Sequence, residues 1–123
     1  MTINAPPQQV NTPLIHKVCD IYKKFYTLSS KSPKRDKLGI YLRIENICLD
    51  VFHNVVTAAF SSKDLKLQVL NSARIKIEVL KRLIRIANEL NIVQKNKYIE
   101  LETDLQEISK MTNGWIKYLT ATL

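Results

Sequence analysis

The chain has 123 residues, a typical length for one globular domain, and 46% of them are hydrophobic. Two glycines and four prolines are too few for the tight turns that an all-β fold needs. The formal net charge of +8 favours an anionic partner such as nucleic acid or a membrane surface. Because the sequence contains no signal-peptide pattern and no apolar run of membrane length, we expect a cytoplasmic protein without a membrane span.

Residues 1–12 are polar, contain two prolines and have no helical periodicity. They predict a flexible N-terminal tail, followed by one bundle domain over residues 13–123. Thr12 and Pro13 form a helix-start signal, because a hydroxyl N-cap precedes the one helical position that tolerates proline. The first predicted helix runs to about Leu28, and its apolar strip contains Ile15, Val18, Cys19, Tyr22, Phe25 and Tyr26.

The second predicted helix begins at a repeat of the same signal, Ser32 followed by Pro33, and extends to about Phe60. At about 100° per residue, one side of this helix is apolar. Its members are Ile40, Ile44, Cys48, Val51, Val55 and Ala58.

The third predicted helix opens at a capping-box-like pair, Ser61 and Asp64, and ends near Asn91. It carries two apolar stripes. The first has the 3-4 spacing of a core seam: Leu70, Ala73, Ile77, Leu80, Ile84 and Ala87. The second lies on a different side: Ile75, Val79, Leu83, Ile86 and Leu90. One stripe is enough for an isolated bundle, so we interpret the second as an oligomer interface. The alternative is that loops or a tight bundle cover it.

The fourth predicted helix follows a short turn over residues 91–96. Its seam consists of Tyr98, Leu101, Leu105, Ile108, Thr112, Trp115 and Leu119, so the single tryptophan is expected in the core. Four helices joined by short connections predict an all-α protein, an antiparallel up-down four-helix bundle.

No residue pattern indicates catalysis or metal binding. Asp50 and His53 approximate one fragment of a bundle metal site, but both fall on a polar face. Cys19 and Cys48 lie on apolar strips, where burial blunts thiol reactivity. The only glycines, Gly39 and Gly114, do not form a phosphate-binding loop. We therefore expect a protein that is not an enzyme and has no cofactor.

The basic side chains concentrate in the first three quarters of the chain. On the third helix, Arg74, Lys81 and Arg85 share one stripe, and Glu78 is the only acid within it. Cations in a row on a helix favour phosphate contact, although a solvated face is the alternative for any single lysine. The predicted nucleic-acid contacts are Lys66, Arg74, Lys81, Arg82 and Arg85, together with Lys23, Lys24, Lys34, Arg35 and Lys37 from a cluster around the first connection that also contains Lys17 and Lys31. Because no aromatic residue interleaves with the third-helix stripe, we expect backbone recognition without base reading.

Three segments resemble one protein family. They are Glu107 to Lys117 (EISKMTNGWIK), Val79 to Leu90 (VLKRLIRIANEL) with Tyr98 beyond it, and Pro33 to Gly39 (PKRDKLG). Together they resemble the accessory variability determinant (Avd) proteins of diversity-generating retroelements. This family belongs to a wider group of four-helix bundles that includes proteins encoded in intervening sequences of ribosomal RNA genes. The resemblance covers roughly residues 14–119. The family ending often has Gly-Gly before the tryptophan, where this chain has Asn113 and Gly114.

The resemblance implies a non-catalytic accessory protein in a homopentameric barrel. Such a protein binds template RNA or cDNA, associates with the reverse transcriptase of the element and supports mutagenic retrohoming. Arg85 matches the arginine of the family's Leu-x-x-Leu-x-Arg-x-Ala-type run, and Arg74 and Lys81 fall among its basic helix positions. Two alternatives stay open: a bundle of the ribosomal intervening-sequence type, and a structural protein-interaction module with no nucleic-acid role.

Overall fold

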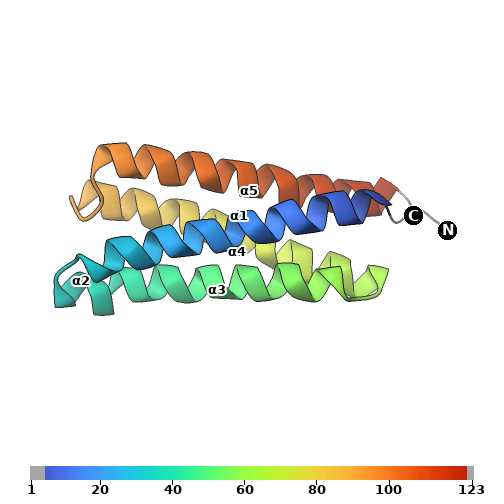
Figure 1. Cartoon of the computed structure of the whole chain (residues 1–123), viewed down its shortest axis with the longest axis horizontal. Helices are drawn as coiled ribbons and strands as arrows, with labels where there is room; N and C mark the ends of the chain where they lie inside the picture. The colour runs from blue at the N-terminus through green and yellow to red at the C-terminus, as the bar shows by residue number, and fades with distance from the viewer. Residues whose placement is uncertain (1–4, 122–123) are drawn as a thin grey trace.

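The computed structural model describes residues 5–121, with side chains from residue 12 onward. Its helices are α1 (Ala5–Ser30), α2 (Lys34–Leu38), α3 (Ile40–Ala59), α4 (Lys63–Glu89) and α5 (Lys95–Ala121). The four long helices run up and down beside one another, and α2 is a short helix in the first connection (Figure 1). Helices α1 and α4 each contact both α3 and α5, so the order around the bundle is α1, α3, α4, α5. The predicted all-helical bundle is confirmed.

The core is formed by one stripe from each long helix. All six residues of the predicted α4 seam are buried, and so are Leu101, Leu105, Ile108, Thr112, Trp115 and Leu119 on α5. On α1 the buried positions are Leu14, Val18, Ile21, Phe25 and Ser29. Tyr26, which was predicted on the apolar strip of this helix, is 61% exposed. Its exposure follows from helical geometry, because the core positions recur every three or four residues and Tyr26 lies beside that row.

Two predicted helix boundaries are wrong. Helix α1 begins at Ala5 and contains Pro13, so Thr12 and Pro13 do not start it. Pro13 removes one hydrogen bond from the helix without ending it. The flexibility predicted for residues 1–12 stays a prediction, as does the division into a tail and a domain, and residues 1–4 lie outside the described part of the chain.

The predicted second helix is divided into α2 and α3 at Gly39. A Cβ atom at Gly39 would lie 2.8 Å from the backbone oxygen of Arg35, closer than real Cβ atoms come to such an atom. Only glycine fits this close approach of the backbone to the preceding turn. The break leaves α2 as a separate short helix at the end of the bundle, in the connection between α1 and α3 (Figure 1).

Helix α4 ends in a Schellman motif. Asn91 has a positive φ of 61°, and the N–H of Ile92 donates to the oxygen of Ala87 at 2.8 Å. The N–H of Asn91 donates to the oxygen of Asn88 at 3.0 Å, which completes the motif. Asparagine tolerates this backbone conformation better than most side chains. The motif reverses the chain within a few residues and lets α5 return along α4.

Candidate nucleic-acid interface

The basic stripe of α4 is partly neutralised. Glu78 pairs with Lys81 at 3.2 Å and with Arg82 at 3.0 Å. The hydrogen bond donated by Arg82 lowers the pKa of the Glu78 carboxyl below its usual value, and the hydrogen bond donated by Lys81 adds to this effect. Arg85 is exposed and lies in a shallow depression with Glu102, which comes from α5. A hydrogen bond to Tyr98 raises the pKa of the Arg85 guanidinium. The neighbouring acids Glu78 and Glu102 therefore lower the net positive charge of the stripe.

The two remaining predicted residues of α4 lie in different surroundings. Arg74 is exposed, and its Nε atom is 3.4 Å from the side-chain oxygen of Asn71. Lys66 is half-buried, and its ammonium donates to the oxygen of Ala58 at 2.6 Å. The same ammonium lies 5.8 Å from the centre of the Trp115 ring, and burial lowers its pKa. Lys66 thus connects three helices of the bundle, an arrangement that serves packing.

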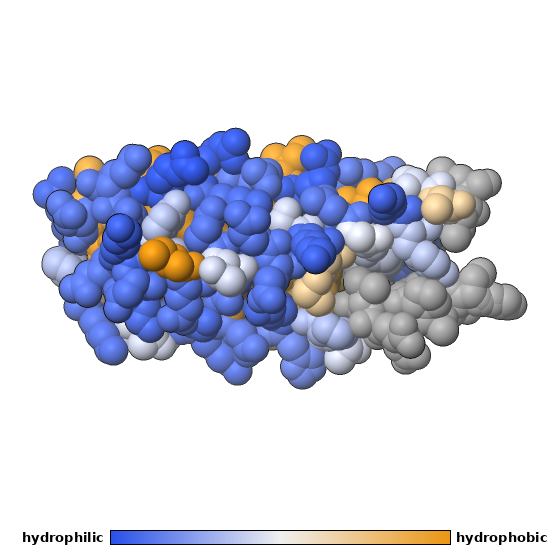
Figure 2. Space-filling model, turned by 90° about the horizontal axis from the view of Figure 1, so that it is seen from above, coloured by the Kyte–Doolittle hydropathy of each residue, from blue (hydrophilic) through white to orange (hydrophobic). Residues whose placement is uncertain are grey.

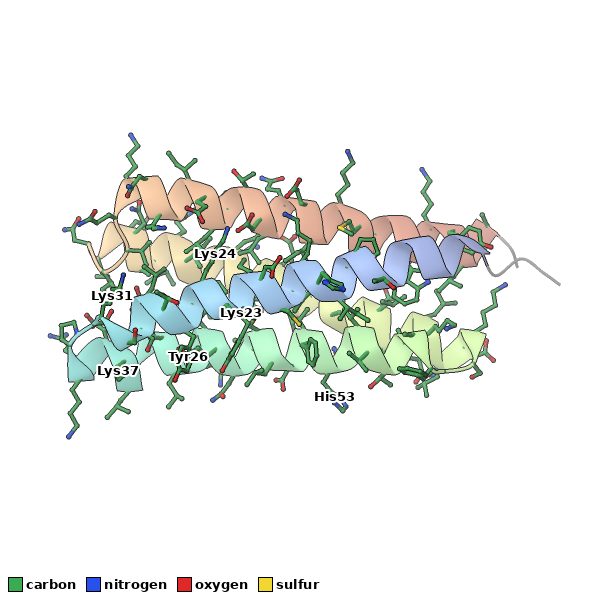
Figure 3. The ribbon with its side chains drawn as sticks, in the orientation of Figure 1. Lys23, Lys24, Tyr26, Lys31, Lys37 and His53 are labelled. Atoms are coloured by element: carbon green, nitrogen blue, oxygen red, sulfur yellow. The ribbon has the colours of Figure 1, made fainter. Side chains whose placement is uncertain are left out.

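Two lysines of α1 form ion pairs with α5. Lys24 is 2.6 Å from Asp104 and 2.8 Å from Glu100, and it points toward α5 (Figure 3). Lys17 pairs with Glu107 and lies 3.7 Å from Asp104. The hydrogen bonds that the two ammonium groups donate to these carboxylates raise the pKa of both lysines. Lys24, a predicted phosphate contact, is therefore engaged within the fold.

The other predicted cations gather around α2. We define the connection cluster as Lys23, Lys31, Lys34, Arg35 and Lys37, all of them exposed. Among the described residues, no carboxylate lies within 4.0 Å of any of their charged groups. Asp36 is the one acid between Lys31 and Lys37 in the sequence. Figure 3 shows Lys31 and Lys37 at this end of the bundle and Lys23 further along α1. This surface concentrates unpaired positive charge.

The second apolar stripe of α4 is open to solvent in the single chain. Ile75 is 58% exposed, Ile86 44% and Leu90 62%. Val79 is also exposed and Leu83 is half-buried. Among the described residues of the stripe only Leu83 packs against the core, so the bundle by itself leaves four of the five stripe residues exposed and does not bury the stripe. By contrast, the face seen from above in Figure 2 is mostly hydrophilic, with its apolar residues in small separate groups.

The residues considered for catalysis or metal binding are scattered. Asp50 and His53 are exposed on α3. Over residues 5–121, no group of three or more His, Cys, Asp or Glu side chains could hold a metal ion. Cys48 is buried, which raises the pKa of its thiol to about 12, and Cys19 is half-buried on α1. None of the described helices combines the length and apolar character that crossing a membrane requires.

A family model described as bAvd-like matches residues 14–119. The chain belongs to this family of accessory variability determinant proteins. No curated protein and no solved structure matched the chain. The match begins at Leu14 and ends at Leu119, which are the first and last buried residues among those whose side chains the structure describes. In this bAvd-like chain, the connection cluster and the α4 stripes therefore lie within the shared segment.

Proposed function

We propose that this bAvd-like protein is a non-catalytic accessory protein of a diversity-generating retroelement. In this proposal it binds the template RNA or its cDNA, associates with the reverse transcriptase of the element and supports mutagenic retrohoming in the cytoplasm. The family match over residues 14–119 carries the proposal. The connection cluster supports it, because exposed cations without acidic partners attract phosphates and keep that attraction when the bundle folds.

Nucleic-acid binding is assigned chiefly to the connection cluster. The α4 residues Arg74, Lys81, Arg82 and Arg85 are proposed as a weaker second surface, because Glu78 and Glu102 lie beside three of them. Lys24 and Lys66 contribute little, since both ammonium groups already have partners in the fold. We therefore expect RNA affinity to depend on where the positive charges lie, in addition to how many there are.

A triple charge reversal tests this location. The variant Lys34→Glu, Arg35→Glu and Lys37→Glu is compared with Lys95→Glu, Lys110→Glu and Lys117→Glu, which changes the net charge equally at exposed lysines of α5. The α2 variant is expected to weaken RNA binding about tenfold or more beyond the control, measured by anisotropy at low salt. The slope of log K against log salt should fall by roughly 0.7 to 0.9 per lost phosphate contact. Equal affinities for the two variants would remove the connection cluster from the proposal.

We also propose a homo-oligomer, a pentamer by resemblance to the family, in which the exposed stripe of α4 packs against a neighbouring subunit. Closed rings bury two different patches at each contact, and an apolar stripe of this length suits one of them. Light scattering after size exclusion tests the assembly. Ile86→Glu should shift the mass to that of a monomer, whereas Ile99→Glu, at a 53% exposed position on α5, should leave it unchanged. A monomeric wild-type protein at micromolar concentration contradicts the assembly.

Association with the reverse transcriptase is tested by co-purification with the product of the neighbouring gene, before and after nuclease treatment. Retention after nuclease indicates a direct protein contact, and loss indicates a contact through RNA. A chain encoded beside ribosomal RNA, with no reverse transcriptase gene nearby, would favour the intervening-sequence alternative. Absence of nucleic-acid binding at low salt would favour the structural-module alternative.

A further inference from the structure

Tyr26 is an aromatic side chain presented to solvent beside the connection cluster. It lies on α1, 61% of it is exposed, and its ring centre is 6.4 Å from that of Tyr22, one helical turn earlier. Tyr22 is half-buried against the core, so it supports one side of the Tyr26 ring. The two rings are tilted by 43° to each other, and Tyr26 is the more exposed of the two. Figure 3 shows Tyr26 on the α3 side of α1.

Two cations, Lys23 and Lys37, lie beside this ring. Lys37 lines the same shallow depression as Tyr26, together with Ser29, Ser30 and Glu45. Lys23 lies three residues before Tyr26, where the helix repeat brings the two side chains to neighbouring positions. Figure 3 shows Lys23 and Lys37 on either side of Tyr26, whereas Lys31 lines a separate depression with Gln94 and Lys97. Glu45 is the one carboxylate in the depression, and it forms no ion pair with Lys37.

We propose that Tyr26 is a stacking platform for an unpaired base of single-stranded RNA or DNA, with the flanking phosphates bound by Lys23 and Lys37. An exposed aromatic ring among cations is the arrangement that binds single strands, because every base has a π-face and every nucleotide a negative charge. A duplex keeps its base faces stacked inside, so the ring adds nothing to duplex binding. The inference rests on the proposed nucleic-acid function and replaces the backbone-only recognition expected from the α4 stripe.

A second copy of the chain fits this surface less well. It would have to cover Lys23 and Lys37, neither of which has an acidic partner in the described structure. Burying unpaired charge is strongly unfavourable, whereas a phosphate backbone supplies the missing negative charge. Charge complementarity therefore selects nucleic acid as the occupant.

The test compares a labelled oligouridine single strand with an RNA duplex of the same length, by anisotropy on the full-length protein. Tyr26→Ala is expected to weaken single-strand binding about tenfold and duplex binding less than twofold. Tyr26→Phe should bind like the wild type, because the ring is kept. Phe60→Ala, which removes a ring that is 87% exposed at the turn between α3 and α4, should bind both probes like the wild type.

Three outcomes overturn the inference. They are unchanged single-strand affinity in Tyr26→Ala, equal losses for both probes, and a change in oligomer mass on light scattering, which would identify the surface as a subunit contact. If the α2 charge reversal abolishes binding while Tyr26→Ala does not, the proposed function stands and the stacking platform fails. If the wild type binds neither probe at low salt, both fail. Photo-crosslinking of an iodouracil-containing strand should label the peptide that contains Tyr26, and labelling confined to other peptides contradicts the inference.

Discussion

At the scale of single residues, the two glycines have opposite roles. Gly39 has no space for a Cβ atom, because the backbone oxygen of Arg35 lies 2.8 Å from that position. Gly114 is exposed within α5, and nothing lies within 4 Å of the corresponding position. The glycine-rich ending typical of the family is therefore not needed for close packing inside this bundle. Any requirement for it would come from contacts outside the single chain.

Alanine at each glycine should change stability in opposite directions. Gly39→Ala is expected to lower the free energy of unfolding by about 1–3 kcal/mol, because the backbone of α2 must move. Gly114→Ala should raise it by about 0.5–1 kcal/mol through better helix propensity. Urea unfolding followed by circular dichroism measures both changes. A neutral Gly39→Ala variant would show that the connection between α2 and α3 adapts without cost.

Replacement of Lys66 should change the stability of the fold without changing RNA binding. Its ammonium donates to Ala58 and lies over Trp115, so Lys66→Met should lower the free energy of unfolding by about 1 kcal/mol. The same variant should bind RNA nearly as well as the wild type at low salt. Lys76→Met, at another half-buried lysine of α4, controls for the loss of one charge. A large loss of RNA affinity specific to Lys66→Met would restore this residue to the interface.

At the scale of elements, the contact between α1 and α5 is held by ion pairs as well as by the core. Lys17 and Lys24 face Glu100, Asp104 and Glu107 across the two helices. Exposed pairs of this kind contribute little individually, about 0–1 kcal/mol each. Their arrangement nevertheless affects which cations of α1 remain available, because Lys17 and Lys24 already have carboxylate partners on α5.

These pairs predict a loss of stability in acid. Lys17 lowers the pKa of the Glu107 carboxyl, and Lys24 lowers that of Glu100, below the ordinary value of 4.5. A depressed folded-state pKa stabilises the fold above the unfolded value and loses that effect as the pH falls through the folded one. Unfolding free energies measured from pH 6 downward should therefore begin to decrease near pH 4.5. The double variant Lys17→Met and Lys24→Met should decrease less steeply, and an identical pH profile would show that the pairs do not contribute.

At the scale of the whole molecule, the single chain leaves two different surfaces exposed. They are an apolar stripe along α4 and a cationic surface around α2 without ion pairs among the described residues. The proposed oligomer buries the first, and the proposed nucleic acid neutralises the second. Repetition of the connection cluster around a ring would multiply weak phosphate contacts into a higher overall affinity.

Oligomer formation should make thermal stability depend on concentration. If only folded chains associate through α4, raising the protein concentration stabilises the folded state by mass action. The midpoint of thermal unfolding should therefore rise between micromolar and hundred-micromolar protein. The Ile86→Glu variant should have a midpoint that is independent of concentration, and a dependence retained in this variant would place the interface elsewhere.

The sequence by itself determined the four long helices, most of the core stripes of α3, α4 and α5, and the surplus stripe of α4. On α1 it missed the buried positions Leu14 and Ile21. Periodicity is a local property, and residues such as Leu70, Ile77 and Ile84 repeat with the helix whatever surrounds them. Periodicity did not predict the break at Gly39, because the apolar spacing continues past this glycine. The close approach of its backbone to the oxygen of Arg35 arises only in three dimensions.

Only the tertiary structure decided which cations are available and which aromatic ring is exposed. Lys24 and Asp104 are 80 residues apart in the chain, so their pairing follows from the packing of α1 against α5 and from no local pattern. Tyr26 follows Phe25 in the sequence, and the side of α1 that packs against its neighbours decides that Phe25 is buried and Tyr26 is exposed. Both outcomes depend on the angle of one helix against another, which periodicity leaves open. The surface proposed for nucleic acid consists of the side chains that stay exposed and without ion pairs after α1 has packed against α3 and α5.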